Sequence, residues 1–306
     1  MIGVVTNPNA KGVVRDPLLS HRLAAIGGKC ALVVETHDLA ELYQAMKEFA
    51  AQGVDIVAAC GGDGTNLAVL TAMIQAYGAD RLPAFAILRG GTVNTVAANL
   101  GIKGSPEDIL SRLVACYQLG LAEPMETRPL LGVNGSYGFL FGSAMASRFF
   151  EAYYAGPAAG LVWASFLAAR ITFSSLLGTK FSRWLFQPVA ARVTVDGKVL
   201  PQERWTLLVA STLMNVGLQF RITYRALERE GHFHLIASGM HPSHLARQIH
   251  KTFLARPLKG EPHFDVLPQE VIIEFERPEA YIMDGDLFQA ERVVLTNGPR
   301  VRLCLP

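Results

Sequence analysis

A glycine-rich segment with a single aspartate, Cys-Gly-Gly-Asp-Gly-Thr at residues 60–65, has the residue types that most clearly suggest chemistry. An apolar run precedes it, and Leu67, Leu70 and Ile74 follow at a spacing typical of one helix face. Glycine lets the main chain approach an anion closely, and a helix start offers unpaired N–H groups. A carboxylate beside phosphate needs a cation or a reacting hydroxyl between them. The loop therefore indicates phosphoryl chemistry, although an ordinary tight turn has the same composition.

The elements around this loop alternate between strand and helix patterns over the first 120 residues. Apolar runs at residues 2–5, 31–35, 56–59 and 84–88 predict strands, and periodic segments between them predict helices. Such alternation predicts an α/β domain with a Rossmann-like parallel sheet and helices on both faces. A second glycine turn, residues 90–92, also follows a strand. Both turns are therefore expected at the carboxyl edge of the sheet, where ligands bind in such folds.

After about residue 121 the pattern becomes mainly β. Asp196-Gly197 between two apolar runs is a strong hairpin signal, and one helix is expected at residues 242–254. The sequence thus predicts two domains, residues 1–122 and a mainly antiparallel β-sandwich domain at residues 123–306, whose last strand can return to the first domain. Further strands are expected at residues 205–210, 233–237, 271–275, 281–283, 292–295 and 301–303.

Composition narrows the functional classes. The 306 residues carry 28 basic and 26 acidic side chains, so no basic excess indicates nucleic acid as a partner. Four cysteines without close spacing predict neither a disulfide framework nor a zinc site, which suits a reducing cytoplasm. No targeting segment is visible, and the uncharged stretch at residues 152–169 is interrupted by Pro157, so it is interpreted as non-spanning.

Four motifs in order resemble the diacylglycerol kinase catalytic family, which includes bacterial lipid kinases, sphingosine kinases and ceramide kinases. They are Asn7-Pro8, the loop at residues 61–65, Gly-Gly-Thr-Val-Asn at residues 90–94, and Asp-Gly-Asp at residues 284–286. Similar glycine-aspartate loops occur in NAD kinases and phosphofructokinases, which share the expected fold. The second glycine turn and the late Asp-Gly-Asp favour the lipid kinases.

The resemblance implies an ATP- and Mg²⁺-dependent kinase that phosphorylates a hydroxyl of diacylglycerol, ceramide or a sphingoid base. Asp63 would act through Mg²⁺. Asp284 looks like the family's general base, and Asp286 stands where the family usually has glutamate; Asp284-Gly285 is equally a hairpin turn. The residues implied to contact the nucleotide are Asn7, Gly61, Gly62, Asp63, Gly64, Thr65, Gly91, Thr92 and Asn94.

One departure from the family concerns a stretch that in many bacterial members holds a structural magnesium ion. Here residues 230–234 read Glu-Gly-His-Phe-His, and neutral imidazole is a poor ligand for Mg²⁺. That ion is expected to be absent or different. Two interpretations of these histidines remain open. His232 and His234 could bind a transition metal, or they could be surface or core histidines without a metal. The departure also leaves open a catalytically impaired lipid- or nucleotide-binding protein, and an enzyme like NAD kinase is a further alternative.

The acceptor side is suggested by a basic and aromatic stretch. Residues 152–195 hold four basic residues, eight aromatic residues and no acid. This composition suits transient docking of a cytoplasmic protein on the anionic inner face of a membrane, although the same aromatics could form the core of the β domain. The sequence names neither the lipid nor the oligomeric state, and a homo-oligomer stays open.

Overall fold

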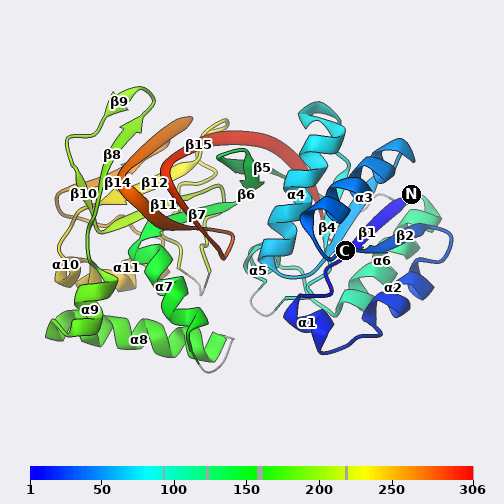
Figure 1. Ribbon diagram of the computed structural model, residues 1–306, viewed down its shortest axis with the longest axis horizontal. Coiled ribbons are helices and arrows are strands. Elements are labelled where there is room, and N and C mark those ends of the chain that lie inside the picture. The colour runs from blue at the N-terminus through cyan, green and yellow to red at the C-terminus, as the bar shows by residue number, and fades with distance from the viewer. Residues whose placement is uncertain (92–93, 122–123, 157–160, 218–219, 306) are drawn as a thin grey trace. The chain divides into compact units, whose positions relative to one another are not determined.

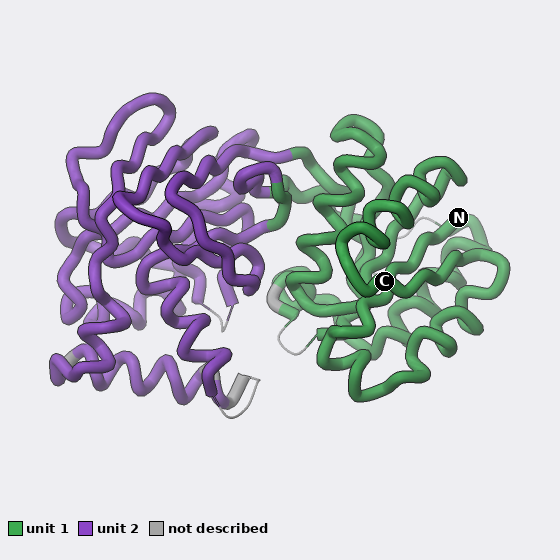
Figure 2. The backbone as a smooth tube through the Cα atoms, viewed as in Figure 1, with its two compact units in different colours: residues 1–130, 136–138, 299–306 green, residues 131–135, 139–298 purple. Residues whose placement is uncertain are grey.

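The computed structural model describes residues 1–91, 94–121, 124–156, 161–217 and 220–305. The chain forms two compact units (Figure 2). Unit 1 consists of residues 1–130, 136–138 and 299–306, and unit 2 of residues 131–135 and 139–298. The end of the chain therefore belongs to the same unit as its beginning.

A parallel sheet forms the centre of unit 1 (Figure 1). Its strands lie in the order β4-β3-β1-β2, and the end of β15 joins beside β4 with Leu303 opposite Phe85. Strands β1, β3 and β4 are fully buried, as expected of central parallel strands that are covered on both faces. The strands are β1 (Ile2–Thr6), β2 (Ala31–Glu35), β3 (Ile56–Cys60), β4 (Ala84–Ile87) and β15 (Asp286–Cys304).

Helices cover both faces of this sheet, with α3 and α4 on one side and α2 and α6 on the other (Figure 1). Asp38 caps α3 by accepting a hydrogen bond from the Glu41 N–H, as the sequence predicts. A capping box between Ser105 and Asp108 begins α6. The helices are α1 (Lys11–Val14), α2 (Leu19–Gly27), α3 (Leu39–Ala51), α4 (Asp63–Tyr77), α5 (Thr95–Asn99) and α6 (Pro106–Leu119), with a 3₁₀ turn at Ala79–Arg81.

Unit 2 is built on antiparallel strands in the order β13-β12-β11-β7-β14-β15, with β8 also paired to β14. The fold class predicted from the sequence is thus confirmed, a parallel α/β region followed by an antiparallel strand-rich region. The strands of unit 2 are β7 (Leu140–Ala144), β8 (Val189–Val195), β9 (Lys198–Val199), β10 (Arg204–Trp205), β11 (Leu207–Ser211), β12 (His234–Ser238), β13 (His263–Val266) and β14 (Glu270–Met283). Strand β5 (Met125–Val133) begins in unit 1 and ends in unit 2, and β6 (Ser136–Gly138) belongs to unit 1.

Unit 2 contains more helix than the sequence pattern indicates. Three helices precede β8, namely α7 (Met145–Tyr154), α8 (Leu161–Leu177) and α9 (Lys180–Leu185). The helix expected at residues 242–254 divides at Gln248 into α10 (Pro242–Arg247) and α11 (Ile249–Phe253). Helix α8 gives a weak periodic signal because apolar residues occur on its exposed side as well as on its buried side.

The uncharged stretch at residues 152–169 contributes to α7 and α8. No helix in the described ranges is both long and apolar enough to cross a membrane.

Candidate active site

Three turns of unit 1 meet at the carboxyl ends of β1, β3 and β4. The main chain joins them directly: the Asn7 N–H donates to Cys60 O at 3.1 Å, and the Gly12 N–H donates to Gly90 O at 3.1 Å. Because these strands are parallel and adjacent, their loops emerge at one edge, where a doubly wound fold binds ligands. The structure therefore brings the first three of the four motifs together.

The two glycine turns are packed so closely that side chains cannot separate them. A Cβ on Gly91 would lie 2.4 Å from the Gly62 Cα, and a Cβ on Gly12 would lie 2.3 Å from Gly90 O. Sequence reasoning did not select Gly12 or Gly90 as site residues, although glycine at each was the available signal. We call residues 61–65 and 90–91 the glycine cradle.

This packing predicts an asymmetric response to alanine. Gly91→Ala should lower the free energy of unfolding of unit 1 by about 2 kcal/mol, because its methyl group meets main chain that cannot move aside cheaply. Gly62→Ala is the matched control, because its Cβ would lie 3.6 Å from the Gly91 Cα, an ordinary contact. Urea unfolding of both variants measures the difference, and equal stabilities would contradict the proposed packing.

Polar side chains hold the cradle in shape. The Asn7 amide donates to the Thr65 hydroxyl at 2.9 Å, which joins β1 to the start of α4. Asn94 has a φ of 51° and bridges Gly91, accepting from its N–H at 3.2 Å and donating to its carbonyl at 2.9 Å. Thr92 lies outside the described residues. These contacts order the main chain before any ligand binds.

Asp63 is the first residue of α4, directly inside the cradle. Its Oδ1 accepts a hydrogen bond from the Val96 N–H at 3.3 Å, in the first turn of α5, a partner that sequence reasoning missed. The first turn of a helix also presents N–H groups without partners inside the helix, together with the positive end of its dipole. The arrangement can therefore bind an anion and still keep a carboxylate beside it.

Asp284 occupies the turn between β14 and β15 in unit 2. Asp284 and Gly285 have φ values of 47° and 94°, the two positive angles of a tight hairpin turn. The carboxylate is 5% exposed and accepts hydrogen bonds from the Phe139 N–H at 3.0 Å and the Leu140 N–H at 2.8 Å. The hairpin interpretation thus holds, and the side chain additionally fixes the start of β7.

Asp286 lies two residues further on, at the first position of β15, and its side chain is exposed. Desolvation by the surrounding chain nevertheless raises the pKa of its carboxyl above the ordinary value of 3.8. An accessible carboxylate with a raised pKa suits proton transfer better than a buried carboxylate held by main-chain donors. Both aspartates lie in unit 2, whereas the cradle lies in unit 1.

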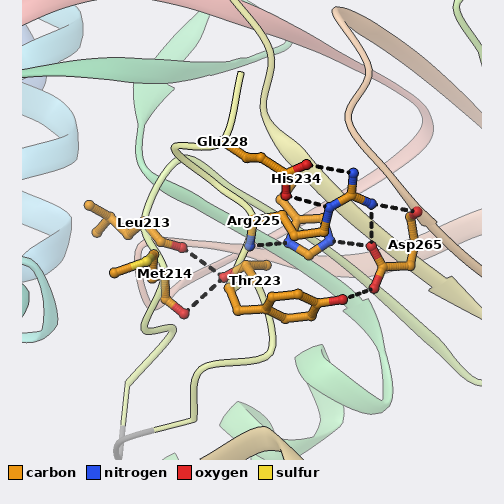
Figure 3. A network of polar contacts seen from close by, with 8 residues as sticks. Leu213, Met214, Thr223, Arg225, Glu228, His234 and Asp265 are labelled. Carbon is orange, nitrogen blue, oxygen red and sulfur yellow. Dashed lines mark hydrogen bonds and ion pairs between the residues drawn. The ribbon is translucent and has the colours of Figure 1, made fainter. Parts of the chain in front are cut away.

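The stretch at residues 230–234 contributes to a polar network and not to a cluster of metal ligands (Figure 3). His234 is fully buried, accepts from the Arg225 N–H at 3.2 Å and bonds to Asp265 at 2.9 Å. The Arg225 guanidinium reaches the same Asp265 oxygen at 2.9 Å. Among the described residues, no group of three or more His, Cys, Asp or Glu side chains could hold a metal ion. The transition-metal interpretation of His232 and His234 therefore gains no support.

This network predicts an acid-sensitive contribution to the stability of unit 2. Burial opposes ionisation of Asp265, but hydrogen bonds from His234, Tyr224 and Arg225 outweigh it and lower the pKa of the carboxyl. Because its pKa is lower in the folded chain, ionised Asp265 stabilises the fold at pH values above its pKa in the unfolded chain, which is about 4. This stabilisation is lost as the pH falls through the pKa of Asp265 in the folded chain. Asp265→Asn should lower the free energy of unfolding by about 2 kcal/mol at pH 7 and less at pH 3. Urea unfolding at the two pH values checks this, and a loss that does not depend on pH would contradict it.

Comparison with known proteins agrees with this geometry. A doubly wound α/β unit with a glycine cradle at its carboxyl edge defines a class of phosphate-binding domains. Residues 2–120 match the model of the diacylglycerol kinase catalytic domain. A search of curated proteins gave no match.

Solved structures from Bacillus anthracis str. Sterne share the fold of the whole chain. A candidate diacylglycerol kinase aligns with a TM-score of 0.70 at 16% identity, covering 100% of this chain and 96% of the other. A second candidate aligns with a TM-score of 0.70 at 17% identity over 100% and 97% of the two chains. A diacylglycerol kinase aligns with a TM-score of 0.64 at 14% identity over 100% and 96%. At such identities the likeness establishes the fold.

Proposed function

We propose that the chain is an ATP-dependent lipid kinase that transfers the γ-phosphoryl group to a hydroxyl of a lipid such as diacylglycerol, ceramide or a sphingoid base. The observation that carries this proposal is the glycine cradle with Asp63 at the start of α4, inside the region that matches the diacylglycerol kinase catalytic domain. We further propose that residues 1–122 bind the nucleotide and residues 123–306 bind the lipid.

In this proposal the cradle holds the phosphates of ATP. Main-chain N–H groups of Gly61, Gly62 and Gly64 and the Thr65 hydroxyl would face the phosphate oxygens, with Asn7, Gly91, Thr92 and Asn94 at the border of the nucleotide. The hydrogen bonds of Asn7 and Asn94 support this role, because they preorganise the turns, and preorganised donors stabilise charge without reorganisation during the reaction.

Asp63 fits a magnesium ion, since a carboxylate is the hard oxygen ligand that Mg²⁺ prefers and its neighbours are glycines that leave room for phosphate. The ion, when bound, neutralises charge on the transferred phosphoryl group. The chain supplies one carboxylate for it, and the nucleotide would supply further oxygens. The Val96 N–H would orient Asp63 toward this task.

The transfer step itself needs little from the protein beyond positioning. The lipid hydroxyl oxygen attacks the γ-phosphorus, the bond from that phosphorus to the bridging oxygen of ADP breaks, and the hydroxyl proton passes to a carboxylate. Asp284 is the base that the family resemblance implies. Asp284 is buried, whereas Asp286 is exposed and has a raised pKa, so we favour Asp286 as the acceptor of the proton. Asp284 would fix the turn that carries Asp286 through its hydrogen bonds to main-chain N–H groups.

A lipid acceptor also implies transient contact with a membrane surface, and we propose a cytoplasmic protein that is peripheral at the inner face. The sequence offers no basic excess for nucleic acid as a partner. A homo-oligomer remains compatible with the proposal.

The test is phosphorylation of a total lipid extract by the purified chain with ATP and Mg²⁺, analysed by mass spectrometry, with NAD as a parallel acceptor. A phosphorylated lipid would support the proposal and name the acceptor. Transfer to NAD alone would favour an NAD kinase-like enzyme. Nucleotide binding without transfer to any acceptor would favour a catalytically impaired binding protein.

A further inference from the structure

The exposed aromatic side chains of the described residues all belong to unit 2. They are Tyr154, Phe166, Phe173, Trp184, Phe253 and Phe288. Exposed leucines, in contrast, occur in both units. Contact of an aromatic ring with water is unfavourable. Because the exposed rings occur in one unit only, we expect that unit to carry a surface for a binding partner.

Helix α8 carries the most exposed of these rings on a single stripe. Phe166 is 57% exposed, Phe173 68% and Leu177 79%. Residues 166, 170, 173 and 177 follow the i, i+4, i+7, i+11 spacing of one helix face, so Arg170 lies within the same stripe. The opposite side of the helix is buried through Leu167 and Ile171, which are 1% and 3% exposed within the apolar core that α8 shares with α7, α9 and α10. Among the described residues, α8 thus packs Leu167 and Ile171 into the core on one side and exposes Phe166, Phe173 and Leu177 on the other.

Helix α9 extends the stripe with charge. After a short turn it begins at Lys180, and Lys180 and Arg183 are exposed together with Trp184. The Arg170 guanidinium stacks on the Phe181 ring at 4.4 Å, which ties the two helices together. Residues 161–188 contain these three cations and no acidic side chain. We call the exposed side chains of residues 166, 170, 173, 177, 180, 183 and 184 the α8–α9 surface. Figure 1 labels the two helices that carry it.

We propose that the α8–α9 surface docks on an anionic lipid bilayer, with α8 lying in the plane of the interface. Phe166, Phe173, Leu177 and Trp184 enter the acyl boundary, and Arg170, Lys180 and Arg183 contact lipid phosphates. This inference rests on the proposed lipid kinase function, for which it names the surface that meets the lipid. It assigns a partner to the exposed sides of Phe166, Phe173 and Trp184.

Charge decides between a bilayer and a second copy of the chain. A symmetric dimer through this surface would bring the same patch against itself. Its three cations would then face three cations with no acid in residues 161–188 to pair with them, which opposes association. An anionic bilayer has the complementary charge and accepts both aromatic rings and cations at its interface.

The experiment measures binding of the full chain to vesicles without ATP, so that it does not depend on catalysis. Sedimentation with phosphatidylcholine vesicles is compared with sedimentation with equimolar phosphatidylcholine and phosphatidylglycerol. The wild-type chain should prefer the anionic vesicles. Phe166→Ser/Phe173→Ser should weaken this binding on the order of tenfold. Lys180→Gln/Arg183→Gln should weaken it about 25-fold, from about fivefold for each cation near the surface, and should reduce the preference for anionic lipid to the share that Arg170 supplies.

A matched pair of leucines provides the control. Leu177→Ser on α8 should weaken binding, whereas Leu119→Ser in unit 1, at 72% exposure, should leave it unchanged. All four substituted chains should unfold at the temperature of the wild type, because the replaced side chains are exposed.

Three results decide the proposal. The proposal would be overturned if the Phe166→Ser/Phe173→Ser variant bound anionic vesicles as tightly as the wild type. It would also be overturned if the wild type bound both vesicle types equally. Loss of self-association in that variant, with vesicle binding kept, would also overturn it and assign the surface to a second copy. If the chain shows the predicted vesicle binding but phosphorylates no lipid, the docking proposal is supported. Only the proposed kinase function is then contradicted.

Discussion

An Asp63→Asn variant is expected to keep its fold and to lose phosphoryl transfer on the order of a thousandfold in kcat. Asparagine has the shape of aspartate, and its amide oxygen can still accept the Val96 N–H, so the cradle should stay intact. What disappears is the negative charge that would hold a divalent cation next to the phosphates. The decrease in kcat would therefore come from lost charge neutralisation, because the geometry of the cradle is unchanged.

The measurement combines activity with a binding readout. Calorimetry should show that Mg²⁺ strengthens ATP binding to the wild-type chain and no longer does so in Asp63→Asn. Asp80→Asn is the control, because Asp80 is an exposed aspartate of the same unit that follows α4 and lies outside the cradle. A variant at Asp63 with normal kcat and a normal magnesium effect would exclude the proposed role.

The second large effect is a separation of stability from activity at the β14–β15 turn. Asp284→Ala should lower the free energy of unfolding of unit 2 by about 3 kcal/mol, because the buried N–H groups of Phe139 and Leu140 lose their acceptor. Asp286→Asn should change it by less than about 0.5 kcal/mol, since the side chain is exposed. Its turnover should nevertheless fall by about 10²- to 10⁴-fold, the usual contribution of a positioned general base.

The pH profile provides an independent check. A general base must be ionised, so activity should fall as the pH drops through a pKa that is raised above 3.8, and Asp286→Asn should remove this acid limb. Urea unfolding and pH–rate profiles of Asp284→Asn, Asp284→Ala and Asp286→Asn measure both effects. Lost turnover in a stable Asp284→Asn variant, beside normal turnover in Asp286→Asn, would instead assign the proton to Asp284.

The sequence was most informative where local patterns suffice. Full burial on both faces produces continuous apolar runs, and short parallel strands with glycine turns produce repeated signals, so the strands and turns of unit 1 followed from residue types alone. Helix α3 was likewise predictable, because its cap at Asp38 depends only on neighbouring residues. Helix α8 was missed as an element since its exposed phenylalanines obscure the polar side of the periodic pattern.

Contacts between distant residues were beyond local patterns. The sequence marks Gly62 and Gly91 as turn residues, but only the pairing of β3 with β4 brings them close enough to exclude a side chain. It places Asp284 and Asp286 in one motif, yet it cannot distinguish them. Asp284 is buried and bonded to main-chain N–H groups at residues 139–140, about 145 positions away, whereas Asp286 is exposed.

The sequence by itself determined the class of fold and the order of the glycine-rich motifs, because strand periodicity, glycine turns and helix caps are local properties. Only the tertiary structure decided which aspartate is exposed, which glycines touch, and that His234 joins Arg225 and Asp265 in a hydrogen-bonded network. The physical reason is that burial and hydrogen bonding depend on which strands become neighbours, and long-range pairing is set by the packing of the whole chain.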